Sequence, residues 1–574
     1  MTKRLVTWSV LAYLHGHRLV SGLPEMRYRD VLQARNKFVE NDLVHRYYDT
    51  TNTYSDVQEL YMTQPLDHFD ATNEATYQQR YFVSYRHDQS SSLPILNLLC
   101  VGGEGPGFDK SVLVDSVHCT GDMLEVAKRI ASHDRYNVHL YALEHRYYGK
   151  SYPTFEDGSS PLTTANLKYH SSLQALEDLA HFVRKINQET NSADATWITF
   201  GGSYPGMMAL YARYKYPHLI FAAVSSSAPI QAQVDFAGYK ARQGWDLAYQ
   251  KVGGSCECHR IVTVGHEQAV ALLMQTNSTD GALELATKFN LCDPSTVLTK
   301  RRNQEMFLGD GMINIPAQNN DPSCTRDELC NIEGLCDYMI HQLKMISAPI
   351  TIIQHDDDAP NYPELEVLAK VSRKQQQFAA RRRHHQQHDD NLWENCLSVD
   401  FDAMLKEVTN TVVDDFGWRP WLYQTCSEFG FYQTCGDDCP FASHFHKIDM
   451  DLEICEKAFN ITNVYDNVQA TLDRYGGRDI VCTDASRILS INGNVDPWSV
   501  LSLSDKDETK YSLPIKGVEG ASHHFWTHPV KDTDAPEVAQ AREYIYSVVM
   551  NWIGMEPDAE ISLQQAAFKT SATS

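Results

Sequence analysis

Phe200-Gly-Gly-Ser-Tyr-Pro-Gly206 lies between a strand-like apolar run, Ala195–Phe200, and a helix-like run, Pro205–Tyr216. A strand that turns sharply into a helix leaves no room for side chains, and a glycine meets this need two residues before Ser203. Proline stands where a second glycine is usual, but it suits the first turn of a helix, where no N–H is needed. The stretch therefore predicts a nucleophile elbow, with the Ser203 hydroxyl at the positive end of the helix dipole. The alternative is an ordinary glycine-rich turn.

Strand-like and helix-like runs alternate around this turn, from about residue 76 to residue 230, and again near the C-terminus. The expected strands are Gln79–Tyr85, Pro94–Val101, Asn137–Leu143, Leu219–Ser225, Arg487–Ile491 and Leu513–Val518, and the expected helices include Leu173–Ile186 and Ala535–Ile553. Such alternation predicts a mostly parallel sheet covered by helices. We therefore expect an α/β core in two parts, 23–230 and 477–556. A cysteine-rich, mainly helical insertion at 231–476 separates them, and a flexible tail follows at 557–574.

A base and an acid for the serine are predicted in two loops of the second core part. Asp496 stands in Asn492-Gly-Asn-Val-Asp-Pro-Trp498, directly after a strand, and Gly520-Ala-Ser-His-His-Phe-Trp526 follows the next strand. The order serine, acid, histidine is the one expected after a nucleophile elbow. All three segments meet at the carboxyl edge of a parallel sheet. The distance from the glycine turn favours His523 as the base, and His524 remains open.

Two backbone N–H donors are needed to stabilise the oxyanion that a serine nucleophile generates. One is expected from Tyr204, directly after the serine, and the other from Gly103 or Glu104 in Gly102-Gly-Glu-Gly-Pro-Gly107. This glycine-rich stretch lacks the Lys-Ser/Thr pair of a phosphate-binding loop, so we discount a nucleotide site there.

Two apolar side chains are placed to shape a substrate pocket. Met207 lies one helical turn beyond the serine on the same face, and Trp498 lies two residues after Asp496. An apolar, aromatic pocket suits a flat ring such as proline. The alternative is that both side chains belong to the core.

The composition and the N-terminus indicate the compartment. The chain has 574 residues with 50 Lys and Arg against 74 Asp and Glu, a formal net charge of −24, which argues against nucleic acid as the main partner. Lys3, Arg4, the apolar stretch Leu5–Leu14 and the small residues Ser21–Gly22 predict a secretory signal peptide over 1–22. The alternative is a cytosolic N-terminus. No later apolar run reaches the roughly 18 residues of a membrane span, so no stable membrane insertion is expected.

The cysteine pattern agrees with export. Most of the 14 cysteines lie within 256–482, which indicates disulfides in an exported protein. Cys256-Glu-Cys258-His259 and Cys435-Gly-Asp-Asp-Cys439 are alternative zinc ligands, but neither has a matching second pair, so we expect no metal. Glycosylation sequons at Asn277 and Asn460 also suit an exported chain.

Arg373–His388 is a stretch rich in arginine, histidine and glutamine. A charge run of this kind predicts a solvated helix or loop. The alternative is binding of a metal or an anionic surface through His384, His385 and His388.

Several separated stretches together resemble one family of serine peptidases, which contains lysosomal prolyl carboxypeptidase, dipeptidyl peptidase II and thymus-specific serine protease. The matching stretches are Leu66-Asp-His-Phe69, Gln79-Arg-Tyr81, Gly103-Glu-Gly105, Glu144-His-Arg-Tyr-Tyr-Gly149, Ala175-Leu-Glu-Asp-Leu179, Gly201-Gly-Ser-Tyr204, Lys215-Tyr-Pro217, Ser227-Ala-Pro229 and Asp496-Pro-Trp498. The stretch 421–434 looks most like the thymus-specific branch. The matches run from about Tyr61 to Trp552.

The resemblance implies an α/β-hydrolase fold with a large, mainly helical, disulfide-rich cap inserted before the Asp/His segment. It implies peptide hydrolysis, often next to proline, by a triad, an oxyanion hole and a proline pocket. The residues it assigns are Ser203 as nucleophile, Asp496 as acid, His523 as base, Tyr204 at the oxyanion hole, and Met207 and Trp498 at the pocket. Glu428 is a candidate anchor for a substrate amino terminus, or else a structural partner of a buried arginine. Phe525-Trp526 departs from the Leu-Asp common in prolyl carboxypeptidase, so the direction of exopeptidase action stays open.

We therefore expect a serine exopeptidase that is secreted or directed to a lysosome or vacuole and acts on short proline-containing peptides. No organic cofactor is implied, and the oligomeric state is open, a homodimer included. The alternatives are an esterase or lipase on the same core and a catalytically inert binding protein that kept the fold.

Overall fold

The computed structural model describes residues 26–27, 54–274, 278–324, 329–347, 362–387, 396–414, 416–443, 445–504, 506–507 and 513–555. The expected signal peptide at 1–22, the tail at 557–574 and the sequon at Asn277 lie outside these residues. Asn460, the asparagine of the other sequon, is exposed at the end of a helix.

The core is an eight-stranded sheet with the strand order β12-β11-β7-β6-β4-β5-β3-β2. Its strands are β2 (Gln58–Pro65), β3 (Thr76–His87), β4 (Ile95–Val101), β5 (Asn137–Leu143), β6 (Thr196–Gly202), β7 (Ala222–Ser226), β11 (Ile488–Gly493) and β12 (Ile515–Val518). The strands from β12 to β5 in this order run parallel, and β3 and β2 join antiparallel at one edge. Every residue of β5 is buried, as expected for a strand covered on both faces.

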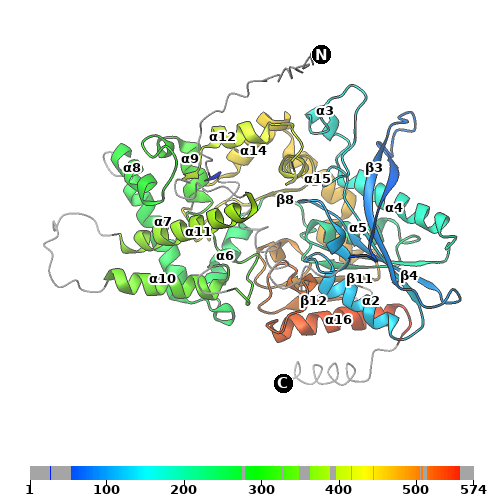
Figure 1. The fold of residues 1–574 in the computed structure, drawn as a ribbon. Helices are drawn as coiled ribbons and strands as arrows, with labels where there is room; N and C mark the ends of the chain where they lie inside the picture. The colour runs from blue at the N-terminus through cyan, green and yellow to red at the C-terminus, as the bar shows by residue number, and fades with distance from the viewer. Residues whose placement is uncertain are drawn as a thin grey trace, which may run out of the picture.

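Helices cover both faces of this sheet (Figure 1). α4 (Ser172–Glu189) and α5 (Tyr204–Lys215) contribute to one apolar layer, and α2 (Glu125–Ala131) and α16 (Pro536–Trp552) contribute to the other. This arrangement is the α/β-hydrolase fold predicted from the sequence.

One predicted strand is shorter than expected. The apolar run Leu219–Ser225 becomes the strand β7 only at Ala222. The N–H groups of Leu219 and Ile220 both bond back to the Tyr216 carbonyl, so the first residues of the run close the preceding helix instead.

A long, mainly helical cap is inserted between β7 and β11, and Figure 1 shows it as the green and yellow helices beside the sheet. Its main helices are α6 (Gly238–Ala248), α7 (Cys256–Leu273), α8 (Ser278–Lys288), α10 (Ile332–Ser347), α11 (Pro363–Gln387), α12 (Phe401–Val408), α13 (Trp418–Gln424), α14 (Ile448–Phe459) and α15 (Val464–Tyr475). A short strand β8 (Gln233–Asp235) pairs with β10 (Gly430–Tyr432) across it. The backbone at 373–387 is helical and belongs to α11.

Disulfides hold the cap. The bonded pairs are Cys258–Cys336, Cys292–Cys396, Cys324–Cys330, Cys426–Cys455 and Cys435–Cys439 in the cap and Cys100–Cys119 in the core. Both zinc alternatives therefore lose sulfur ligands to disulfides. Cys256 and Cys482 are free and exposed.

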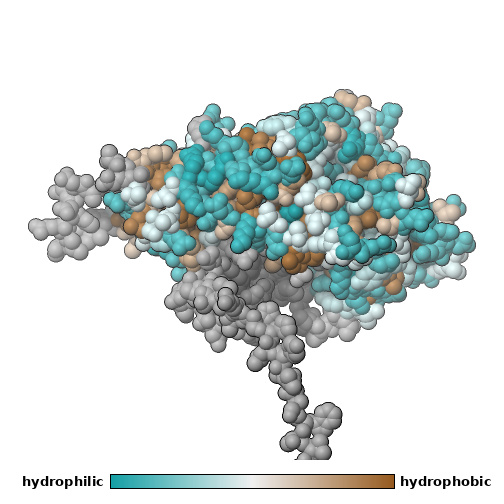
Figure 2. All heavy atoms as spheres, turned by 90° about the horizontal axis from the view of Figure 1, so that it is seen from above, coloured by the Kyte–Doolittle hydropathy of each residue, from teal (hydrophilic) through white to brown (hydrophobic). Residues whose placement is uncertain are grey.

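The surface is mainly hydrophilic on the face shown in Figure 2, where hydrophobic side chains form small, separate groups. Among the described residues, none of the helices combines the length and the apolar character that crossing a bilayer requires. The buried apolar side chains form two clusters, one on each face of the sheet, and the larger cluster continues into the cap.

A buried polar network joins several of the stretches that carry the family resemblance. The fully buried Arg146 guanidinium donates to both oxygens of Asp178, at 2.6 and 2.7 Å. The Tyr77 hydroxyl and the His68 ring contact the same carboxylate at 2.8 Å each. A bidentate pair of this kind is strong because both groups are ionised and two parallel N–H···O hydrogen bonds join them.

A second carboxylate holds the glycine-rich loop at 102–107. Glu144 accepts hydrogen bonds from the Arg80 guanidinium at 2.6 Å and from the N–H of Phe108, just past the loop, at 3.1 Å. It also accepts from the Lys150 N–H and the Ser151 hydroxyl. The resemblance motifs in this part of the core therefore fix the loop that the sequence assigned to the oxyanion hole.

Replacing Arg146 by Met is expected to lower the free energy of unfolding by about 3–5 kcal/mol, because it leaves the Asp178 charge buried without its main partner. Thermal and denaturant unfolding measure this effect. The control is Arg184→Met on the exposed face of α4, where the ion pair with Glu177 is long, at 3.9 Å, and about half exposed. Equal stability losses in the two variants would contradict the assigned role of the buried pair.

Candidate functional site

Ser203 has the strained backbone of a nucleophile elbow. Its φ of 62° and ψ of −132° place a non-glycine residue in a rare conformation between β6 and α5. The Ser203 N–H donates to the Ser226 carbonyl at 2.9 Å, which holds the turn. A Cβ atom at Gly201 would lie 2.4 Å from the Pro205 carbonyl oxygen, so only glycine fits there. The glycine rule used to interpret the sequence thus has a direct steric cause.

Asp496 and His523 form a buried pair beside the elbow. The His523 Nδ1–H donates to Asp496 Oδ2 at 2.7 Å, and Asp496 Oδ1 accepts from the Trp498 N–H at 2.9 Å. Both side chains are almost fully buried. His523 Nε2 has no hydrogen-bond partner among the described residues. In the neutral ring, a proton on Nδ1 leaves Nε2 as the nitrogen that accepts a proton.

His524 has different neighbours. Its N–H donates to the Ser227 hydroxyl, and its ring nitrogen Nδ1 contacts the Thr527 hydroxyl at 3.1 Å. Burial lowers the pKa of His524 well below its ordinary value. Of the two adjacent histidines, only His523 contacts Asp496 in the described structure.

The glycine-rich loop packs against the start of α5. A Cβ atom at Gly103 would lie 2.4 Å from Pro205 Cγ and 3.2 Å from the Pro205 nitrogen. The peptide groups around Gly103 and Glu104 therefore lie close to the Tyr204–Pro205 peptide. This close approach suits the predicted pair of oxyanion donors.

Five of the predicted residues line a cavity of about 420 Å³ between the core and the cap. Ser203, Tyr204, Glu104, Trp498 and His523 line it from the core. The aromatic residues that line it from the cap are Tyr239, Phe416, Trp418, Trp421, Phe431, Tyr432 and Phe441. Ser203 and His523 thus line the same cavity as a set of aromatic side chains from the cap.

The family model described as serine carboxypeptidase S28 matches residues 64–545 of the chain. The chain belongs to the S28 serine peptidase family. Mouse thymus-specific serine protease is 30% identical to this S28 peptidase over 543 residues, covering 92% of this chain and 94% of that protein. Human lysosomal Pro-X carboxypeptidase is 26% identical over 502 residues, covering 86% of this chain and 88% of that protein. These matches confirm the predicted family resemblance.

Met207 does not line the cavity of this S28 peptidase, although the sequence placed it at the pocket. It is fully buried in the apolar layer between α5 and the sheet. Most of α5 is buried because the sheet and the cap cover it from different sides. The spacing of Met207 from Ser203 along the helix therefore could not distinguish a pocket residue from a core residue.

Glu428 does not line the cavity either. Its carboxylate caps the N-terminus of α4, where it accepts from the N–H of Ser172 at 2.9 Å and from its hydroxyl at 2.7 Å. Arg474 lies 3.9 Å away and is partly exposed, so it is not the buried arginine of the alternative. Burial raises the pKa of Glu428. The residue joins the cap to the core instead of facing a substrate.

A charged cluster on the cap wall of the cavity escaped the sequence analysis. Lys240 Nζ donates to Asp310 Oδ1 at 2.7 Å, and the His446 ring lies between Asp310 and Asp451. Burial opposes a charge on His446, but the two carboxylates outweigh it and raise the pKa of His446 to about 9. The cluster joins three separate parts of the chain, around Lys240, Asp310 and 446–451, so no local pattern could identify it. Within the described ranges, no group of three or more His, Cys, Asp or Glu residues is arranged to hold a metal ion.

A buried carboxyl group lies under the histidine loop. Asp122 is in the π-helical turn η2 (Thr120–Leu124), and the neighbouring Gly121 packs directly on the His528 carbonyl. Burial raises the pKa of Asp122 to about 7. Its Oδ2 atom has no hydrogen-bond partner among the described residues.

Replacing Asp122 by Asn is expected to make the free energy of unfolding depend less on pH. The folded-state pKa of about 7 lies above the ordinary value of 3.8, so the contribution of the protonated acid is fully present below about pH 4. This contribution to the free energy of unfolding, up to about 4 kcal/mol, is lost as the pH rises through 7. Thermal unfolding from pH 4 to pH 8 should show the variant gaining on the parent as the pH rises. A constant difference across this range would contradict the expectation.

Proposed function

We propose that this S28 serine peptidase is an exopeptidase that hydrolyses short peptides on the carboxyl side of proline. Ser203 is the nucleophile, His523 the general base and Asp496 the acid that orients it. The observation that carries the proposal is the buried Asp496–His523 pair: the His523 Nε2 atom has no partner among the described residues, and His523 lines the same cavity as Ser203.

The proposed reaction proceeds through an acyl-enzyme. His523 Nε2 takes the proton of the Ser203 hydroxyl as its oxygen attacks the substrate carbonyl carbon. The N–H of Tyr204, with that of Gly103 or Glu104, stabilises the negative oxygen. The protonated His523 then gives its proton to the leaving amine. In the second half, His523 takes a proton from a water molecule as the water oxygen attacks the acyl carbon, and it returns that proton to the Ser203 oxygen as the acyl–serine bond breaks. Asp496 remains ionised and stabilises the imidazolium.

The preference for proline is supported by the wall around Trp498. Its ring is held by contacts with Phe236, Tyr239 and Phe431 at centroid distances of 5.6, 5.3 and 5.4 Å. A rigid aromatic wall next to His523 suits a flat, apolar ring with no N–H to satisfy. The name of one relative, Pro-X carboxypeptidase, agrees with this preference.

The exopeptidase character is supported by the cap. Residues of the cap line most of the cavity, so in this proposal the substrate enters between the cap and the core, which favours short peptides and chain ends. We further propose that the protein acts outside the cell or in a lysosome or vacuole. The signal peptide expected at 1–22 and the lysosomal relative agree with such a compartment.

Two proline peptides test the proposal and its direction. One has a blocked N-terminus with proline next to last, and the other has a free N-terminus with proline second. Loss of one C-terminal residue from the first identifies a carboxypeptidase, and release of an N-terminal dipeptide from the second identifies a dipeptidyl peptidase. Mass spectrometry reads both products. Cleavage of neither peptide, together with turnover of acyl esters, would overturn the proposal in favour of an esterase.

A further inference from the structure

Gln318 connects the cap to the catalytic histidine. It lies in the cap wall of the cavity, and its backbone carbonyl accepts a hydrogen bond from the His523 N–H at 3.0 Å. Its side-chain Oε1 accepts from the Tyr239 hydroxyl at 2.8 Å and from the Trp498 Nε1–H at 3.1 Å. One residue therefore contacts the base, the proposed proline wall and the cap at once.

The orientation of the Gln318 amide is fixed by these partners. The indole N–H of Trp498 can only donate, so the amide atom that it faces must be the oxygen. The Gln318 Nε2 group is thus turned away from Trp498 and Tyr239. Among the described residues, none accepts a hydrogen bond from it in the structure. Gln318 lines the cavity, and its amide group has two N–H donors that no described residue uses.

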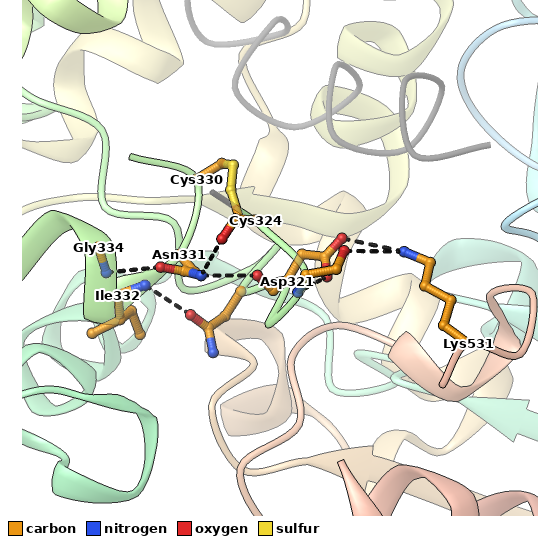
Figure 3. The surroundings of a disulfide bond; sticks show 9 residues. Asp321, Cys324, Cys330, Asn331, Ile332, Gly334 and Lys531 are labelled. Atoms are coloured by element: carbon orange, nitrogen blue, oxygen red, sulfur yellow. Dashed lines mark hydrogen bonds and ion pairs between the residues drawn. A yellow bond between two sulfur atoms is a disulfide. The ribbon is translucent and has the colours of Figure 1, made fainter. Parts of the chain in front are cut away.

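The segment that follows Gln318 makes further contacts, beginning at Asp321 (Figure 3). The Lys531 ammonium, from the core, lies 3.5 Å from Asp321 Oδ2, and both side chains are buried. The Asn331 side chain donates to the Asp321 carbonyl at 3.1 Å, and the disulfide Cys324–Cys330 closes the adjoining loop. Donors held by such a frame need little ordering when a ligand binds.

We propose that Gln318 is a substrate-binding residue whose side-chain N–H donates to a main-chain carbonyl oxygen of the bound peptide. This inference rests on the proposed peptidase function and adds a binding group that orients the peptide next to His523. Peptide carbonyls are the acceptors that every short peptide offers, whatever its side chains. Because the donor contacts the substrate before and during the reaction, its loss should raise KM more than it lowers kcat.

Two variants at this position test the inference. Gln318→Glu keeps an oxygen for Trp498 and Tyr239 but has no N–H to donate, and Gln318→Met has neither. Both are expected to lower kcat/KM for the cleaved proline peptide by about 10-fold or more. The rate of inactivation by a small dialkyl fluorophosphate, which has no peptide carbonyl, should stay within about 2-fold of the parent. The matched control is Gln188→Glu on the exposed face of α4.

Each other outcome overturns the inference in a recognisable way. Equal losses in peptide turnover and in fluorophosphate inactivation would mean that Gln318 acts only through the position of His523. A loss in Gln318→Glu with full turnover in Gln318→Met would mean that the new charge, not the missing donor, is responsible. Parental turnover in both variants removes the inference while the proposed function stands. If the parent cleaves no peptide, the proposed function and this inference fail together.

Discussion

Ser203→Ala is expected to reduce kcat/KM for peptide hydrolysis by about 10⁵-fold or more, while the protein stays folded. The reason is chemical, because the hydroxyl that lines the cavity beside His523 supplies the attacking oxygen in the proposed mechanism. Alanine meets the same backbone strain as serine at a φ of 62°, so the elbow itself should not change. Turnover of the proline peptide that the parent cleaves measures the loss.

The fold of the Ser203→Ala variant must be checked separately, by its thermal unfolding temperature and by its binding of the uncleaved peptide. Both should match the parent. Residual hydrolysis within about 10-fold of the parent, at normal stability, would mean that another group is the nucleophile.

Asp496→Asn is expected to lower kcat/KM by about 10⁴-fold. Asparagine can keep the bond from the Trp498 N–H through its oxygen, but its amide N–H₂ then faces His523 Nδ1. Since Nδ1 must accept that hydrogen bond, the ring proton moves to Nε2, the nitrogen that has to accept the serine proton. The side chains keep their positions, but the His523 ring carries its proton on the wrong nitrogen.

Initial rates of the purified variant measure this effect. The matched control is Asp194→Asn, the same change at an exposed position, which should retain the parental rate. A loss of less than about 10-fold in Asp496→Asn would show that the 2.7 Å contact with His523 does not orient the base.

The core and the positions of the proposed catalytic residues in it could be predicted from the sequence because their signals are local. The turn at Ser203 needs small residues within a few positions of it, and the Asp496 and His523 loops each follow a strand. Parallel strands bring their carboxyl ends to one edge, so local motifs far apart in the chain could be placed together. The structure then supplied the contact that distinguishes His523 from His524.

The cavity wall could not be predicted in the same way. Gln318 and His446 come from irregular cap segments, and only the folded cap brings them to the triad. Met207 and Glu428 were assigned by helical spacing or by resemblance. Met207 is buried because both sides of α5 are covered. Glu428 caps α4 through a contact between residues 256 positions apart. Sequence spacing carries no information on such long-range packing.

The most direct test of the account is to label the protein with an alkyl fluorophosphonate and map the modified residue by peptide mass spectrometry. The account predicts one modified serine, Ser203, and loss of that label in Asp496→Asn, whose base has the wrong tautomer. No label on the folded parent, or a label on a different serine, would contradict the assignment of Ser203 as the nucleophile of this S28 peptidase.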